Sequence, residues 1–187
     1  MERDITITPD NTLHNSENKS FKNIKTFKKA CEVLDINYND VNSVIEDIIK
    51  FSNSKSAATM FKLSIIRRAL NLGQDLPFTK NSKNPCIYYP YNPCVNKNST
   101  LYKGQLNSGK MEIIGKIKVG KIECNILGGG TTCCYANLGF YGTHDELLCC
   151  ASKEIAEHFS KYFGMTITEA KYSNLEGFKI ITNYYKN

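Results

Sequence analysis

Eight cysteines and three histidines are the residues of this chain best suited to metal binding or nucleophilic catalysis. Cys86, Cys94, Cys149 and Cys150 are the set that would have to meet at a zinc ion. Their spacing argues against such a site, because seven residues separate the first pair where zinc fingers and ribbons have about two to four, and adjacent cysteines rarely reach one ion. We therefore expect no bound metal.

The cysteines are better explained as reduced thiols inside the fold. The dipeptides at 133–134 and 149–150 fall in strand-like runs. Because successive strand residues face opposite sides, one cysteine of each pair is expected to point inward as a small apolar side chain. Cys86 and Cys94 flank a Pro-containing turn and could form a disulfide, but that requires an oxidising compartment.

Catalysis by a cysteine and a histidine would need distant residues to meet. His144 lies in an expected turn beside Asp145 and Glu146. It could act as a base for Cys134 or Cys149 only if the fold brought them together. A solvated turn histidine is the simpler interpretation.

Two further motifs have structural explanations. The glycine run 128–130 is followed neither by Lys-Ser or Lys-Thr nor by a helix, as a phosphate-binding loop requires, so it is expected to be a flexible joint. Glu154 and Glu157 stand at the start of an expected helix, where the helix dipole favours acidic residues. With no nucleophile paired to a base, we expect a protein that is not an enzyme and needs no cofactor.

Basic and aromatic residues are the remaining binding candidates. The chain carries a net charge of +6, and the excess lies at residues 19–84, with twelve bases against six acids, and at 97–125, with six against two. Basic groups beside exposed rings can bind phosphates and stack bases, which makes nucleic acid one candidate partner. A protein is the other, since tyrosine offers contact area with a polar end. The candidate binding residues are Tyr88, Tyr89, Tyr91, Lys62, Arg67, Arg68, Lys116 and Lys118.

The unit at residues 131–164 is expected to organise the elements that position these residues. Its sequence predicts a strand, a turn at Gly142–Asp145, a short strand at Glu146–Cys150, and a helix. Ser152 can cap that helix, and Gly164 is its expected end. A sheet should cover one side of the helix, where apolar residues recur at helical spacing. They are Ile155, Ala156, Phe159, Tyr162 and Phe163.

Three helices are expected before this unit. The first begins after Thr26, the second runs from about Asn39 to Phe51, and the third from about Lys55 to Leu72, with Gly73 as its stop. Each has an apolar face. In the first the face is Phe27, Ala30, Cys31 and Leu34; in the second it is Val41, Val44, Ile45, Ile48 and Ile49; in the third it is Ala58, Phe61, Leu63, Ile65, Ile66, Ala69 and Leu70.

The sequence between these helices and the last unit changes character. Residues 75–100 are rich in Pro, Asn and Tyr and predict an extended, turning connector, because a residue before proline avoids the helical region. The runs MEIIGKIKV and KIECNIL, separated by Gly120 and Lys121, predict a hairpin. A last strand within Phe178–Tyr185 is expected at a sheet edge.

Segregated helices and strands favour an α+β fold, with a three-helix N-terminal segment packed on a small antiparallel sheet that carries one C-terminal helix. We expect a flexible arm at residues 1–20 and one α+β domain at 21–187. Within that domain the helical part is 21–74, the connector 75–100, and the sheet with its helix 101–187. No run is long and apolar enough for a membrane span, and the first residues lack the order of a signal peptide.

Two stretches resemble a family of small uncharacterised proteins from phages and prophages of Bacteroidetes. The segments IKTFKKACEVLDI and AATMFKLSIIRRALNLGQDLPF, with the YYP run, are similar to that family's KTFEDAC…LGI, KL.II..ALN.G and YYP patterns. LLCCASKEIAEHFSKYF is similar to its closing LCF.S...AE pattern, with Cys150 at a place usually held by an aromatic residue. The hairpin at about Lys110–Leu127 stands as an insertion. The resemblance implies a phage origin and one compact α+β fold, and it implies no activity.

We therefore expect a phage protein that acts without catalysis through protein contacts, either in the virion or with a host protein in the bacterial cytoplasm. The tyrosines of the connector and the hairpin are the expected contact surface, and a homo-oligomer is one form of it. Nucleic-acid binding by the basic helical half is the alternative. A small cysteine-dependent or metal-binding enzyme is the least favoured.

Overall fold

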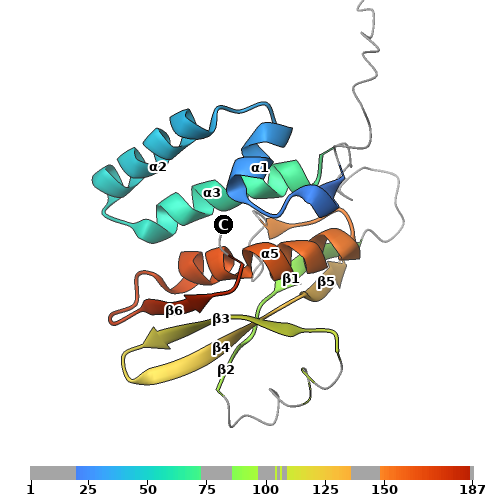
Figure 1. Ribbon diagram of the computed structural model, residues 1–187, viewed down its shortest axis with the longest axis vertical. Helices are drawn as coiled ribbons and strands as arrows, with labels where there is room; N and C mark the ends of the chain where they lie inside the picture. The colour runs from blue at the N-terminus through green and yellow to red at the C-terminus, as the bar shows by residue number, and fades with distance from the viewer. Residues whose placement is uncertain are drawn as a thin grey trace, which may run out of the picture.

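The computed structural model describes residues 20–72, 86–96, 104, 106, 109–135 and 148–185. Three helices precede the strands and one long helix follows most of them, which confirms the α+β class (Figure 1). Within these ranges no helix combines the length and the apolar character that crossing a membrane would require. Of the predicted N-terminal arm only Ser20 lies in the described residues, where its hydroxyl caps the 3-10 turn η2, Phe21–Asn23.

The helices and sheets form layers with one helix in the middle. Helices α1 (Phe27–Val33), α2 (Tyr38–Ser52) and α3 (Lys55–Leu70) lie on one side of α5 (Lys153–Tyr172), and the strands lie on its other side (Figure 1). Helix α5 contacts α3 above and strands of both sheets below. The N-terminal helices therefore reach the sheets mainly through α5.

All strand pairs described are antiparallel. Strands β1 (Cys86–Tyr91) and β5 (Gly130–Tyr135) form one sheet, and a second sheet has the order β2 (Cys94–Val95), β4 (Ile122–Gly128), β3 (Glu112–Val119), β6 (Lys179–Asn183). The predicted hairpin is confirmed as β3–β4, with Gly120 in its turn at φ 57°. The last strand is confirmed as β6, at an edge of its sheet.

The described part of the connector, residues 86–96, is extended and supplies β1 and β2. The glycines at 128–130 connect the two sheets, as predicted, but they are closely packed. Gly129 adopts φ 87°, and its N–H donates to the Ser160 hydroxyl over 3.1 Å. A side chain at Gly128 would overlap Ile114.

Helix α5 begins as predicted and ends later. The Ser152 hydroxyl accepts from the Ile155 N–H over 3.3 Å, as an N-cap does. The expected end at Gly164 is wrong, because the helix continues to Tyr172. Gly164 is instead the point of closest approach to the sheets, where an added Cβ would overlap the side chains of Asn92 and Ile114.

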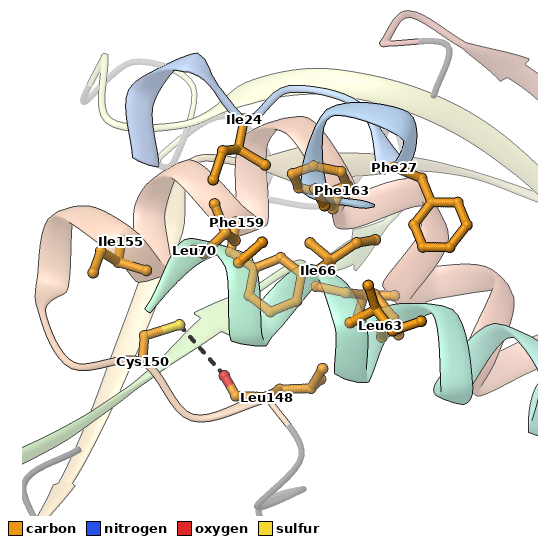
Figure 2. Packing of buried hydrophobic residues seen from close by; sticks show 14 of the residues in the cluster. Ile24, Phe27, Leu63, Ile66, Leu70, Leu148, Cys150, Ile155, Phe159 and Phe163 are labelled. Atoms are coloured by element: carbon orange, nitrogen blue, oxygen red, sulfur yellow. Dashed lines mark hydrogen bonds between the residues drawn. The ribbon is translucent and has the colours of Figure 1, made fainter. Parts of the chain in front are cut away.

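The main core lies between α1, α3, α5 and the segment 148–150 (Figure 2). Phe159, Phe163, Leu63 and Ile66 are fully buried there. The predicted faces of α1 and α3 are confirmed, although α3 ends at Leu70 and its expected stop, Gly73, lies outside the described residues. A second cluster, under α5, contains Ile114, Ile117, Ile126 and Met165.

The predicted strand Glu146–Cys150 is described only from Leu148, and within that part a single bridge to Tyr88 is formed, with the Cys150 N–H donating to the Tyr88 carbonyl over 2.8 Å. The expectation that one cysteine of the 149–150 pair points inward is confirmed, and the other is buried as well. Cys150 packs in the main core, and Cys149 packs with Ile87 and Tyr89. The segment is covered on both sides.

Helix α2 confirms its predicted range within a residue at each end, but its apolar face is only partly covered. Val41 is buried, while Val44 is 45% exposed and Ile49 36% exposed. The reason is that α2 packs mainly against α3, with few contacts to α1. A helix with one neighbour buries a narrow stripe.

Candidate binding surfaces

The three candidate tyrosines do not form an exposed surface. Tyr88 is partly buried and packs against the main core, and Tyr89 is 9% exposed. Tyr91 is 41% exposed. The expectation of an exposed tyrosine connector is therefore wrong for the first two, because β1 lies between β5 and helix α5 instead of crossing the surface.

The candidate basic residues of α3 do not lie together at one binding site. The Lys62 ammonium lies 4.9 Å from the centre of the Phe27 ring, and burial lowers its pKa, although Glu169 acts in the opposite direction. Arg67 reaches inward and donates to the Cys149 sulfur over 3.3 Å. Arg68 stays exposed. Lys62 and Arg67 are partly buried, and nucleic-acid binding by the basic helical half stays a prediction.

Lys116 and Lys118 lie on β3, in the four-stranded sheet. Helix α5 lies between that sheet and the helix that carries Lys62 and Arg67. The structure therefore does not bring the lysines of the hairpin and the basic residues of α3 together.

Lysines do converge along the first half of α5. Two hollows of about 380 Å³ each lie there and share Gly129 and Glu157 as wall residues. We call the pair the lysine groove. Its lysines are Lys22, Lys25 and Lys161 in the first hollow and Lys110 and Lys153 in the second.

Ion pairs hold part of this groove in place. The Lys161 ammonium lies 3.0 Å from a Glu112 carboxylate oxygen, and this hydrogen bond raises the pKa of Lys161. Burial alone would raise the pKa of Glu112, but hydrogen bonds from Tyr185 and Lys161 outweigh it and lower that pKa. Lys153 pairs with Glu157 at 3.7 Å.

Aromatic rings form the floor of the first hollow. The Lys25 ammonium lies 5.2 Å from the centre of the Tyr162 ring, and that ring lies 4.5 Å from the ring of His158. His158 Nε2 is 2.8 Å from the Ile24 carbonyl oxygen, which can only accept, so this nitrogen carries the proton. Burial lowers the pKa of His158, with smaller contributions from Lys25 and Lys161 in the same direction.

Several segments that reach the opposite end of α5 carry exposed apolar residues. Helix α2 ends, β6 begins and the hairpin β3–β4 turns at this end of the molecule, on the left in Figure 1. Two contacts lie at this end: the Ser56 hydroxyl at the start of α3 donates to the Ala170 carbonyl of α5, and the Gly120 N–H in the hairpin turn donates to the Gly177 carbonyl before β6 over 3.3 Å. We call this surface the apolar end; it comprises Phe51, Ile122, Leu175, Ile180 and Ile181.

The exposure at the apolar end is large for residues of this type. Phe51 is 91% exposed, Ile122 63%, Leu175 49% and Ile181 47%. Ile181 is the extra residue at a bulge in β6, since Ile117 pairs with Ile180 and Lys116 with Thr182. Single exposed apolar residues are ordinary, but several large ones at one end are typical of a contact surface.

The cysteines are reduced in the described residues and do not assemble the zinc site considered above. Cys94 hydrogen-bonds with Cys124 across β2 and β4, and burial together with that bond raises the pKa of Cys94 to about 12. Cys149 and Cys150 lie in separate clusters. In the described parts of the chain no three His, Cys, Asp or Glu side chains lie close enough to hold a metal ion. His144 and the side chains of Cys86 and Cys134 lie outside what is described.

Comparison of the chain with protein-family models, with curated proteins and with solved structures gives no match.

Sequence reasoning missed both surfaces for the same reason. The groove lysines stand at 22, 25, 110, 153 and 161, and the apolar end draws on four separate segments of the chain. In the sequence, only Phe51 could have indicated the apolar end. It is a large apolar residue outside the predicted apolar face of its helix, and polar residues follow it.

Proposed function

We propose that this chain acts without catalysis by binding another protein, and that the apolar end is its contact surface. One observation carries the proposal: Phe51, the large aromatic side chain of that end, is 91% exposed among neighbouring segments that also expose isoleucine and leucine. Aromatic residues are enriched at the centre of protein interfaces, where they become buried.

Phe51 adds almost no buried area to the described fold. A side chain that is 91% exposed has removed almost none of its surface from water, whereas full burial of a phenylalanine contributes about 1.5–3 kcal/mol. Burying the Phe51 side chain in an interface would contribute a free energy of that size to binding. The proposal places the contact at α2 and β6, and it replaces the tyrosine connector, which packs inside the molecule.

The phage or prophage origin implied by the sequence resemblance stays a prediction, as does a place in the virion or in the host cytoplasm. A virion component and a host-directed protein both require a stable surface of this kind. The resemblance supports the proposal only in that it implies no catalytic activity.

Sedimentation velocity of the purified full chain tests contact with a second copy. We expect association that grows with concentration and that weakens at least tenfold in Phe51→Ser, because a buried phenylalanine contributes about 1.5 kcal/mol or more. Leu72→Ser is the matched control, since Leu72 is 39% exposed and lies just beyond the opposite end of α3. Equal weakening by both variants would contradict the assignment to the apolar end.

A further inference from the structure

We infer that the lysine groove binds single-stranded nucleic acid, with phosphates on its lysines and bases on its tyrosines. This site is separate from the apolar end, since the groove lies along the first half of α5 and the apolar end lies beyond its last turn. It is also distinct from the basic residues of α3, where Lys62 lies over the Phe27 ring, Arg67 donates to the Cys149 sulfur, and Arg68 is exposed.

The shape of the groove favours a chain of nucleotides. Its two hollows are equal in size, about 380 Å³ each, and adjoin at Gly129 and Glu157. A volume of this order suits one small ligand unit in each. Each hollow is lined by lysine side chains and by aromatic residues, which are Phe21, His158 and Tyr162 in the first and Tyr91 in the second.

The presence of lysine and aromatic side chains in each hollow suits the chemistry of single-stranded nucleic acid. A nucleotide presents a phosphate and a flat base, and proteins bind single strands with basic groups along the backbone and aromatic rings under the bases. An acidic peptide would use the lysines, but carboxylates have no flat group to stack on the exposed Tyr91 ring. The observations therefore favour nucleic acid over an acidic protein segment.

Helix α5 fixes the parts of the groove in position. The Ser160 hydroxyl donates to the Tyr91 carbonyl over 2.9 Å and accepts from the Gly129 N–H over 3.1 Å. Tyr91 pairs in register with Gly130, so no side chain stands opposite its ring on β5. The backbone of Tyr91 is thus fixed, and the residue lines the second hollow and is 41% exposed.

The charge of the groove is positive but partly offset. Five lysines face two glutamates, Glu154 and Glu157. The pKa of Glu154 is lowered by its own backbone N–H and the Ser152 hydroxyl, so it stays charged. Glu157 pairs with Lys153. A carboxylate on the shared wall should weaken phosphate binding, which gives the test a variant that gains affinity.

The test is fluorescence anisotropy of a labelled short oligothymidylate titrated with the full chain. We expect binding at low salt, with log K falling against log salt at a slope of about −2, as contact with roughly three single-strand phosphates gives. Lys22→Gln with Lys25→Gln should weaken binding about tenfold, and Tyr91→Leu should weaken it about fivefold or more through lost stacking. Glu157→Gln should strengthen it severalfold.

The matched control removes the same charge elsewhere. Lys116→Gln with Lys118→Gln changes two lysines of β3, outside the groove, and should change affinity less than twofold. Circular dichroism melting shows whether each variant is folded.

Three results would each overturn the inference: no oligonucleotide binding at low salt, equal loss in the control, or a polyglutamate peptide that binds as tightly as the oligonucleotide. The last result would make the groove a site for acidic protein segments. None of them bears on Phe51, so this inference and the proposed protein contact fail or stand separately.

Discussion

Gly164 lies in the middle of α5, where the usual rule for glycine should be reversed. In an exposed helix interior, replacing glycine by alanine stabilises a protein by about 1 kcal/mol. Here the added methyl group would overlap Asn92 and Ile114. We predict that Gly164→Ala destabilises the fold.

The magnitude follows from what the methyl group displaces. The Asn92 amide donates to the carbonyls of Leu127 and Ser160, both over 2.9 Å, and so ties the end of β1 to β4 and α5. Losing two such bonds costs about 2 kcal/mol, and overpacking adds about 1–3 kcal/mol. After the gain of about 1 kcal/mol in helix propensity, the free energy of unfolding should fall by about 2–4 kcal/mol.

Urea unfolding followed by far-ultraviolet circular dichroism measures this change, since the chain has no tryptophan. The matched variant is Asn92→Ala, which removes the amide that the methyl group meets. In that background Gly164→Ala should cost at least about 0.5 kcal/mol less, as expected for residues in contact. Stabilisation by Gly164→Ala in the wild-type chain would refute the packing argument.

Two further predictions concern titratable side chains. Burial lowers the pKa of His158 in the folded state, so the unfolded state binds the proton more readily. The free energy of unfolding should therefore fall as the pH drops below about 6.5, the ordinary pKa of histidine. Urea unfolding across that range should show a smaller slope in His158→Gln, and an unchanged slope would contradict the assignment. In the native protein, maleimide should label exposed Cys133 before Cys94, because the raised pKa of Cys94 makes its thiolate scarce. The buried thiols of Cys31, Cys149 and Cys150 should react only after unfolding. Peptide mass spectrometry reads the order, and early labelling of Cys150 would contradict the burial.

Local signals in the sequence predicted the elements well. The side chains of Thr26 and Ser152 accept backbone hydrogen bonds at the helix starts where they were expected. The alternating runs on either side of Gly120 form the hairpin, because the pattern and the turn residue agree. Such features depend on neighbours in the chain.

The sequence predictions were wrong where contacts between distant segments determine a residue's surroundings. Gly164 resembled a helix end, yet it is a contact point between α5 and the end of β1, which only the assembled layers show. Tyr88 and Tyr89 followed turn residues, yet they lie on a strand covered by α5. Lys62 and Arg67 resembled solvated cations, yet one lies over a ring and the other reaches a buried thiol.

The candidate surfaces lay beyond prediction for the same physical reason. The lysine groove and the apolar end each take one or two residues from segments far apart in the chain, so no spacing pattern marks them. Helix α5 connects the two, because its first half lines the groove and the chain after its last turn carries Leu175 into the apolar end.

Site-specific photocross-linking tests the central claim, the protein contact at the apolar end, most directly. The full chain would carry a benzophenone side chain at position 51 or, as the control, at position 72, in the cells that naturally make it. The account predicts discrete protein adducts, with a second copy or with another protein, from position 51 and not from position 72. Irradiation that gives no discrete adduct from position 51, or the same adducts from both positions, would contradict it.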